Sequence, residues 1–140
     1  MSRENVDIVR KLHEALVAGD WERATDFVVP EVEFHGTVGG LEEGRVARGI
    51  DQYRHLDEED LEAWDERRFE AEGFVDAGDC VVILQREYRR GKGSGVEVEA
   101  QLAILVDVRD GRVVRVQGYM DRGAGIEAAM RKASRAQPSD

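Results

Sequence analysis

The side chains best suited to chemistry in this sequence are three histidines and one cysteine. His13, His35 and His55 are too far apart for a local metal-binding motif, and His13 and His55 fall in charged, helix-like segments. Cys80 lies in an apolar run, where a lone cysteine acts as a small hydrophobe and forms no intrachain disulfide. We therefore predict no metal site and a buried Cys80.

Two glycine-containing segments resemble phosphate-binding motifs but lack the elements that those motifs need. Gly123 to Ala128 fits a dinucleotide fingerprint, yet only twelve residues follow it, too few for the return strand and the ribose-binding acid. Gly91 to Ser94 lacks the upstream glycine and the following helix of a phosphate loop. No nucleotide or other cofactor is therefore expected.

The composition indicates one folded, acidic domain. The 140 residues include 41% hydrophobic and 36% charged side chains, enough apolar material for a single core. The formal charge of -10 repels nucleic acid and anionic lipid, so we predict neither as a partner. The longest apolar runs are five residues, too short to cross a membrane, and the first eleven residues are not signal-like. A cytoplasmic location is expected.

Three helices are predicted in the first half of the chain. Apolar residues recur at helical spacing from Ile8 to Leu16, and Gly19 ends this helix. Asp20 caps a second, shorter helix, and a brief strand then leads into a glycine-rich loop at 36–49. The third helix is predicted from about 50 to 66. Its inward-facing side chains would be Ile50, Tyr53, Leu61 and Trp64.

From Phe69 onward the hydrophobic pattern has a period of two and predicts four antiparallel strands. The third of them, Val96 to Val108, is apolar on both faces in its middle, so each face needs a cover. The helices can cover one face, and a partner subunit or the C-terminal segment, with a last helix from about 125 to 133, can cover the other. We predict an α+β domain over 1–134, a loose tail at 135–140 and a homodimer.

Several short segments occur in a characteristic order along the chain. They are Glu4 to Leu12, Ala-Gly-Asp-Trp at 18–21, Pro30 to His35, Arg48-Gly49, Asp110 to Val114 and Tyr119 to Arg122. This ordered set resembles SnoaL-like proteins of the nuclear-transport-factor-two-like superfamily, which includes ketosteroid isomerases, polyketide cyclases and limonene epoxide hydrolases. The resemblance covers about residues 3–130. It implies a cone-shaped fold in which three N-terminal helices pack on a strongly curved, mainly antiparallel sheet around an apolar pocket.

The catalytic acids of these enzyme families do not carry over to this chain. The matching positions hold Gly36, Ala103 and Gly118, and Leu12 stands where ketosteroid isomerases have a tyrosine. The nearest substitute for the missing base is His35, which strand alternation places on the opposite face from Gly36. If the protein is an enzyme, the resemblance therefore implies acid-base catalysis by His35 without a cofactor.

Five further side chains are candidates for ligand binding. Gln101 shares a strand face with Ala103, and it either orients a ligand or belongs to a plain sheet edge. Arg86 and Tyr88 share a face of their strand, which lines either the pocket or the solvent and dimer side. Tyr53 and Trp64 are core aromatics that can also contact a ligand.

Three functions are compatible with this reading. The first is a SnoaL-like pocket protein that binds a small, largely apolar metabolite. The second is an isomerase, cyclase or hydrolase that uses proton transfer. The third is a dimeric module whose filled core holds no ligand.

Overall fold

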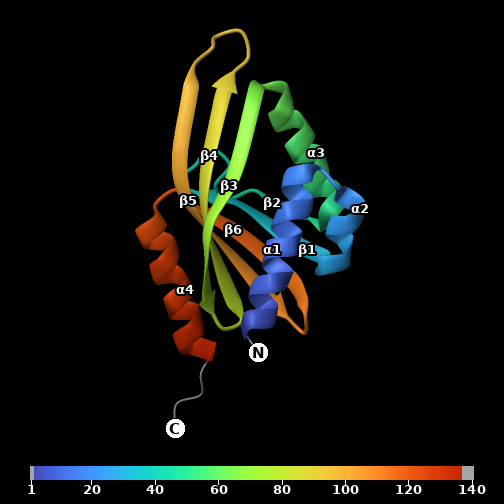
Figure 1. Cartoon of the computed structure of the whole chain (residues 1–140), viewed down its shortest axis with the longest axis vertical. Helices are drawn as coiled ribbons and strands as arrows, with labels where there is room; N and C mark the ends of the chain where they lie inside the picture. Colours follow the sequence, from blue (N-terminus) through green and yellow to red (C-terminus); the bar gives the residue numbers. More distant parts are fainter. Residues whose placement is uncertain (1, 137–140) are drawn as a thin grey trace.

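The computed structural model describes residues 2–136 as one strongly curved sheet with helices on both faces (Figure 1). The strand order is β2-β1-β6-β5-β4-β3, and every neighbouring pair is antiparallel except β1 and β6, which are parallel. The predicted α+β cone is confirmed. The elements are α1 (Ser2–Ala18), α2 (Trp21–Ala24), the 3-10 turn η1 (Thr25–Phe27), β1 (Val28–Val38), β2 (Val46–Arg48), α3 (Gly49–Glu62), β3 (Trp64–Ala77), β4 (Cys80–Gly91), β5 (Glu97–Arg109), β6 (Arg112–Tyr119) and α4 (Arg122–Ala136).

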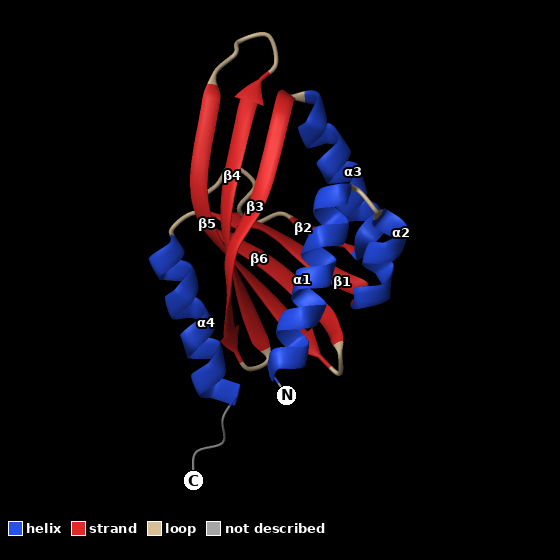
Figure 2. Cartoon of the chain, in the orientation of Figure 1, coloured by secondary structure: helices blue, strands red, loops and turns tan. Residues whose placement is uncertain are grey.

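Helices α1, α2 and α3 cover one face of the sheet, which we call the inner face (Figure 2). As predicted, Gly19 ends α1 with a φ of 69°, a value that costs glycine little, and the Asp20 carboxylate accepts the backbone N–H of Arg23. The core between helices and sheet is continuous. At its centre the ring of Tyr53 stacks on that of Phe34, with ring centroids 4.1 Å apart.

Two predicted boundaries in the first half of the chain were wrong. Helix α3 ends at Glu62, and Trp64 begins β3 instead of continuing the helix. The reason is backbone pairing, because β3 is hydrogen-bonded to β4 from the Trp64–Gly91 pair onward. The glycine-rich stretch at 36–49 is also not all loop, since it contains the end of β1 and the whole of β2.

Helix α4 covers the opposite face of the sheet, which we call the outer face. Ala103 and Leu105 of β5 point to this side and pack against Ala128 and Ala129 of α4. Of the two covers that the sequence left open, the C-terminal segment therefore fills this place. Cys80 is buried in the same cluster, as predicted, and burial raises the pKa of its thiol to about 12.

The helix α4 extends past the predicted domain end at 134, and residues 137–140 of the expected tail lie outside the described part of the chain. The homodimer stays a prediction, to be measured by light scattering. Of the apolar strand face from which the dimer was predicted, the exposed large side chains are Val96 and Val98, near the tip of the β4–β5 hairpin. No helix within 2–136 is long and apolar enough to span a membrane.

An arginine holds α3 against the sheet. Arg67 of β3 donates to both carboxylate oxygens of Asp57, at 3.0 and 3.2 Å, and to Asp60 at 2.8 Å. The other oxygen of Asp60 accepts the indole N–H of Trp64 at 3.2 Å. Only 11% of the Arg67 side chain is exposed, so water screens these ion pairs weakly. The contacts join two successive elements whose boundary the sequence left ambiguous.

Replacing Gly125 by alanine is expected to loosen α4. A Cβ there would lie 2.6 Å from Cβ of Ala103 and 3.2 Å from Cβ of Tyr119, closer than carbon atoms pack. The matched control is Gly123→Ala, because that Cβ meets only the flexible carboxylate of Asp121. Urea unfolding should show Gly125→Ala to be less stable than the control by about 1–3 kcal/mol. Equal stabilities would show that α4 does not pack tightly on β5.

Replacing Arg67 by methionine is expected to lower the free energy of unfolding by about 3 kcal/mol, because two half-buried carboxylates lose their shared cation. Arg68→Met removes the same charge from the next residue, whose side chain is 59% exposed, and should cost less than about 1 kcal/mol. Thermal or urea unfolding of both variants compares the two losses. Similar losses would contradict the role of Arg67 as the anchor of α3.

Candidate functional site

A chain of polar side chains crosses the inner face along β4. Gln85, Glu87 and Arg89 are alternate residues of this strand and share the face that the helices cover. The amide nitrogen of Gln85 donates to Glu87 at 2.6 Å, and Arg89 donates to the other oxygen of Glu87 at 2.7 Å. Arg89 also lies 3.8 Å from the carboxylate of Asp60, so the chain continues into the α3 anchor.

His13 of α1 forms the other end of this polar chain. Its Nε2 lies 2.9 Å from Oε1 of Gln85, and the ring is half-buried. Gln85 is 8% exposed, and no other polar or charged side chain among the described residues is buried. The charged neighbours of His13 favour an exposed ring, yet His13 lies four residues after Val9 and three before Leu16. That spacing places it on the apolar side of α1 and was the signal that could have found it.

Two side chains of the edge strand β3 flank the polar chain on the inner face. Ala71 of β3 pairs with Gln85 and faces the same side, but unlike Gln85 it is exposed. Phe69, the next inward residue of β3, pairs with Glu87 and is half-buried. The sheet edge beside Gln85 therefore carries a short and exposed side chain at Ala71.

The interior is filled at positions where the resemblance places acids in related enzymes. A Cβ at Gly36 would overlap the backbone carbonyl of Glu42, because the segment after β1 folds back over this glycine. A Cβ at Gly118 would lie 2.8 Å from Oγ1 of Thr37. Ala103, the third such position, lies on the outer face under α4. A carboxylate at these three positions would have no place on the inner face.

His35 lies on the outer face and not in the cone. Its Nε2 is 2.9 Å from Glu33, two residues earlier on the same side of β1. The hydrogen bond from His35, together with the positive charge of Arg48, holds the pKa of Glu33 below its usual value. The expected alternation against Gly36 is thus observed, and the structure places His35 in a surface ion-pair cluster apart from His13 and Gln85.

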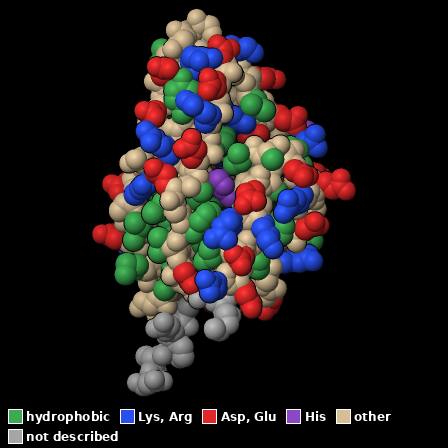
Figure 3. Space-filling view, viewed as in Figure 1, with side chains coloured by type: hydrophobic (Ala, Val, Ile, Leu, Met, Phe, Trp, Pro, Cys, Tyr) green, Lys and Arg blue, Asp and Glu red, His purple; other side chains and the backbone are tan. Residues whose placement is uncertain are grey.

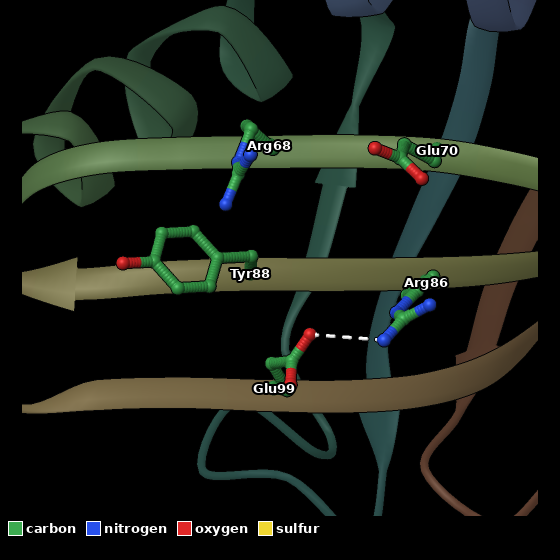
Figure 4. A pocket seen from close by; sticks show the side chains of 5 residues that line it. All are labelled: Arg68, Glu70, Arg86, Tyr88 and Glu99. Atoms are coloured by element: carbon green, nitrogen blue, oxygen red, sulfur yellow. Dashed lines mark hydrogen bonds and ion pairs between the residues drawn. The ribbon is translucent and has the colours of Figure 1, made fainter.

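Three of the predicted ligand residues also lie on the outer face. Gln101 shares a face with Ala103 and Leu105 as expected, but that face points away from the cone, and Gln101 is exposed. Arg86 and Tyr88 line an open hollow of about 230 Å³ (Figure 4). Of the two roles left open for Gln101, this exposed position on the outer face favours the plain sheet edge. The sequence could not assign its face, because β5 is apolar on both sides.

The hollow on the outer face is lined mainly by charged side chains. The guanidinium of Arg68 lies 4.3 Å from the ring centroid of Tyr88, whose hydroxyl donates to Glu97 at 2.6 Å. Arg86 donates to Glu99 at 3.2 Å, as the dashed line in Figure 4 shows. Glu70 also lines the hollow on the outer face. Charged side chains of both signs also cover much of the surface in Figure 3.

Tyr53 and Trp64 lie near the inner polar chain but are engaged within the protein. The ring of Tyr53 is part of the core, and burial raises the pKa of its hydroxyl to about 12. The guanidinium of Arg89 lies 5.7 Å from the ring of Trp64 and 5.2 Å from that of Phe69. Within residues 2–136, no group of three or more His, Cys, Asp or Glu side chains is arranged to hold a metal ion.

Solved structures share this fold along most of the chain. An NTF2-like protein from Burkholderia thailandensis has a TM-score of 0.74 and 24% identity, with 95% of this chain and 97% of that chain covered. A putative SnoaL-like polyketide cyclase from Jannaschia sp. has a TM-score of 0.72 and 20% identity, with 97% and 94% covered. TerC, crystallised with polyporic acid, has a TM-score of 0.71 and 19% identity, with 90% and 98% covered.

Sequence comparison defines the family more directly than these folds do. A search of curated proteins finds no match. The family model described as a SnoaL-like domain matches residues 9–116, which span α1 to the centre of β6. The matched region includes His13, Ala71 and Gln85. The chain belongs to the SnoaL-like family.

Proposed function

We propose that this protein binds a small molecule with an apolar body and a polar group on the inner face, beside His13 and Gln85. The observation that carries the proposal is the buried amide of Gln85, which lies beside the short, exposed side chain of Ala71 at the sheet edge. A buried amide has four hydrogen-bonding positions, and the contacts to His13 and Glu87 use two of them. The rest are available to a ligand.

Two further features support binding at this place. The core on the same face of the sheet is apolar and includes Leu12, Leu16 and Ile83, so a largely apolar ligand body suits this place. The related protein TerC was crystallised with a small molecule, polyporic acid. Proton transfer by His35 receives no support from the geometry, because that side chain lies on the outer face against Glu33.

Binding can be tested with 2-naphthol, a fluorescent probe with an apolar body and one hydroxyl group. We expect Ala71→Trp to weaken binding at least about tenfold, because the indole would cover the sheet edge beside Gln85. Gln85→Leu should weaken binding about fivefold to tenfold through the loss of one hydrogen bond. The matched control is Gln101→Leu, the same change on the outer face, which should leave the Kd unchanged.

Fluorescence titration of the folded variants gives each Kd. Unchanged affinity in both Ala71→Trp and Gln85→Leu would overturn the proposed site. Loss of binding in Tyr88→Ala, with both inner variants unaffected, would place the ligand in the outer hollow instead.

A further inference from the structure

The hydrogen-bond chain on β4 has a direction that Glu87 sets. Its carboxylate accepts from Arg89 at 2.7 Å and from the side-chain amide of Gln85 at 2.6 Å. The ion pair with Arg89 holds this carboxylate in place, and only 12% of the Glu87 side chain is exposed. Because a carboxylate only accepts hydrogen bonds, the NH₂ group of Gln85 must face Glu87, and the amide oxygen must face His13.

The orientation of Gln85 in turn decides which nitrogen of His13 carries the proton. Oε1 of Gln85 lies 2.9 Å from Nε2 of His13, and a carbonyl oxygen only accepts. Nε2 is therefore protonated, and in the neutral ring the lone pair lies on Nδ1. No described residue forms a hydrogen bond with Nδ1.

We propose that Glu87, acting through Gln85, fixes His13 in the Nε2–H tautomer and thereby makes Nδ1 the hydrogen-bond acceptor of the ligand site. The site then takes ligands that offer an O–H or N–H donor on an apolar body. Nδ1 can also accept a proton from such a group without any change in the chain, because Nε2–H keeps donating to Gln85 when the ring is charged. This inference rests on the proposed function and adds the chemical class of its ligand.

Glu87 and Gln85 are positioning residues in this scheme, because they act on the ligand through His13. The amide of Gln85 could otherwise turn over and present NH₂ to the histidine, which would move the imidazole proton to Nδ1. Hydrogen bonds to a charged partner are about twice as strong as neutral ones, so Glu87 favours the described orientation by about tenfold or more.

The tautomer can be measured on the full chain by long-range proton–nitrogen NMR correlations of His13 at about pH 8, where histidine is ordinarily neutral. The wild-type protein should show a protonated Nε2 and an unprotonated Nδ1. In Glu87→Gln the excess of this tautomer should fall by about tenfold. The matched control is Glu99→Gln, the same charge change on the outer face of the adjacent strand, which should leave the ratio as in the wild type.

A wild-type ring protonated at Nδ1 would overturn the proposal without any variant. An unchanged tautomer ratio in Glu87→Gln would remove Glu87 from the scheme. Both measurements are independent of ligand binding, so they can fail while the proposed function stands.

The ligand class is tested by comparing 2-naphthol with 2-methoxynaphthalene, which lacks the donor hydrogen. The wild-type protein should bind 2-naphthol about tenfold more tightly, and His13→Phe should bind both equally. Equal binding of both probes by the wild type would overturn the donor requirement but not the site. Failure of both probes to bind would overturn the proposed function and the ligand class together. The tautomer of His13 is tested separately, by the NMR measurement.

Discussion

The period-two alternation of β4 is the constraint on which the location of every candidate side chain depends. One face of this strand carries Ile83, Gln85 and Glu87 toward the helices, and the other carries Arg86 and Tyr88 toward the outer hollow. Its register with β5 has no bulge, so the whole set of side chains would change faces together if the pairing moved by one residue. Apolar packing on both sides makes such a slip costly, because buried and charged residues would exchange places.

Electrostatics then determines how the polar part of the inner face is held. Arg67 and Arg89 balance the carboxylates of Asp57, Asp60 and Glu87, and the network ties α3 to the sheet while it orients Gln85. The backbone of Gln85 is also held from the outer face of the sheet. Arg122, at the start of α4, donates to the backbone carbonyl of Gln85 at 3.1 Å and forms an ion pair with Glu72. The side-chain amide of Gln85 is thus held by Glu87 and its backbone by Arg122, which suits a group that orients a ligand.

Elements with clear turn residues or apolar periodicity could be predicted from the sequence. Elements whose two faces carry the same kind of side chain could not. Gly19 ends α1 as expected, and Gly78 and Gly111 lie in the tight turns between β3 and β4 and between β5 and β6. Each of the three glycines adopts a positive φ. The start of β3 was read as helix, since an edge strand with charged residues on both faces shows no alternation of apolar residues. The face of β5 that carries Gln101 could not be predicted for the opposite reason, because this strand is apolar on both faces. His13 was missed because charged neighbours on α1 hid its place on the apolar stripe.

The central claim is that a small molecule reaches Gln85 and His13 over Ala71, and contacts between a bound probe and individual methyl groups test it most directly. In a complex with 2-naphthol, we expect intermolecular nuclear Overhauser effects between the ring protons of the probe and the methyl group of Ala71. Such contacts would place the ligand at the β3 edge of the inner face. Contacts from the probe to the ring of Tyr88, with none to Ala71, would contradict the claim and assign binding to the outer face.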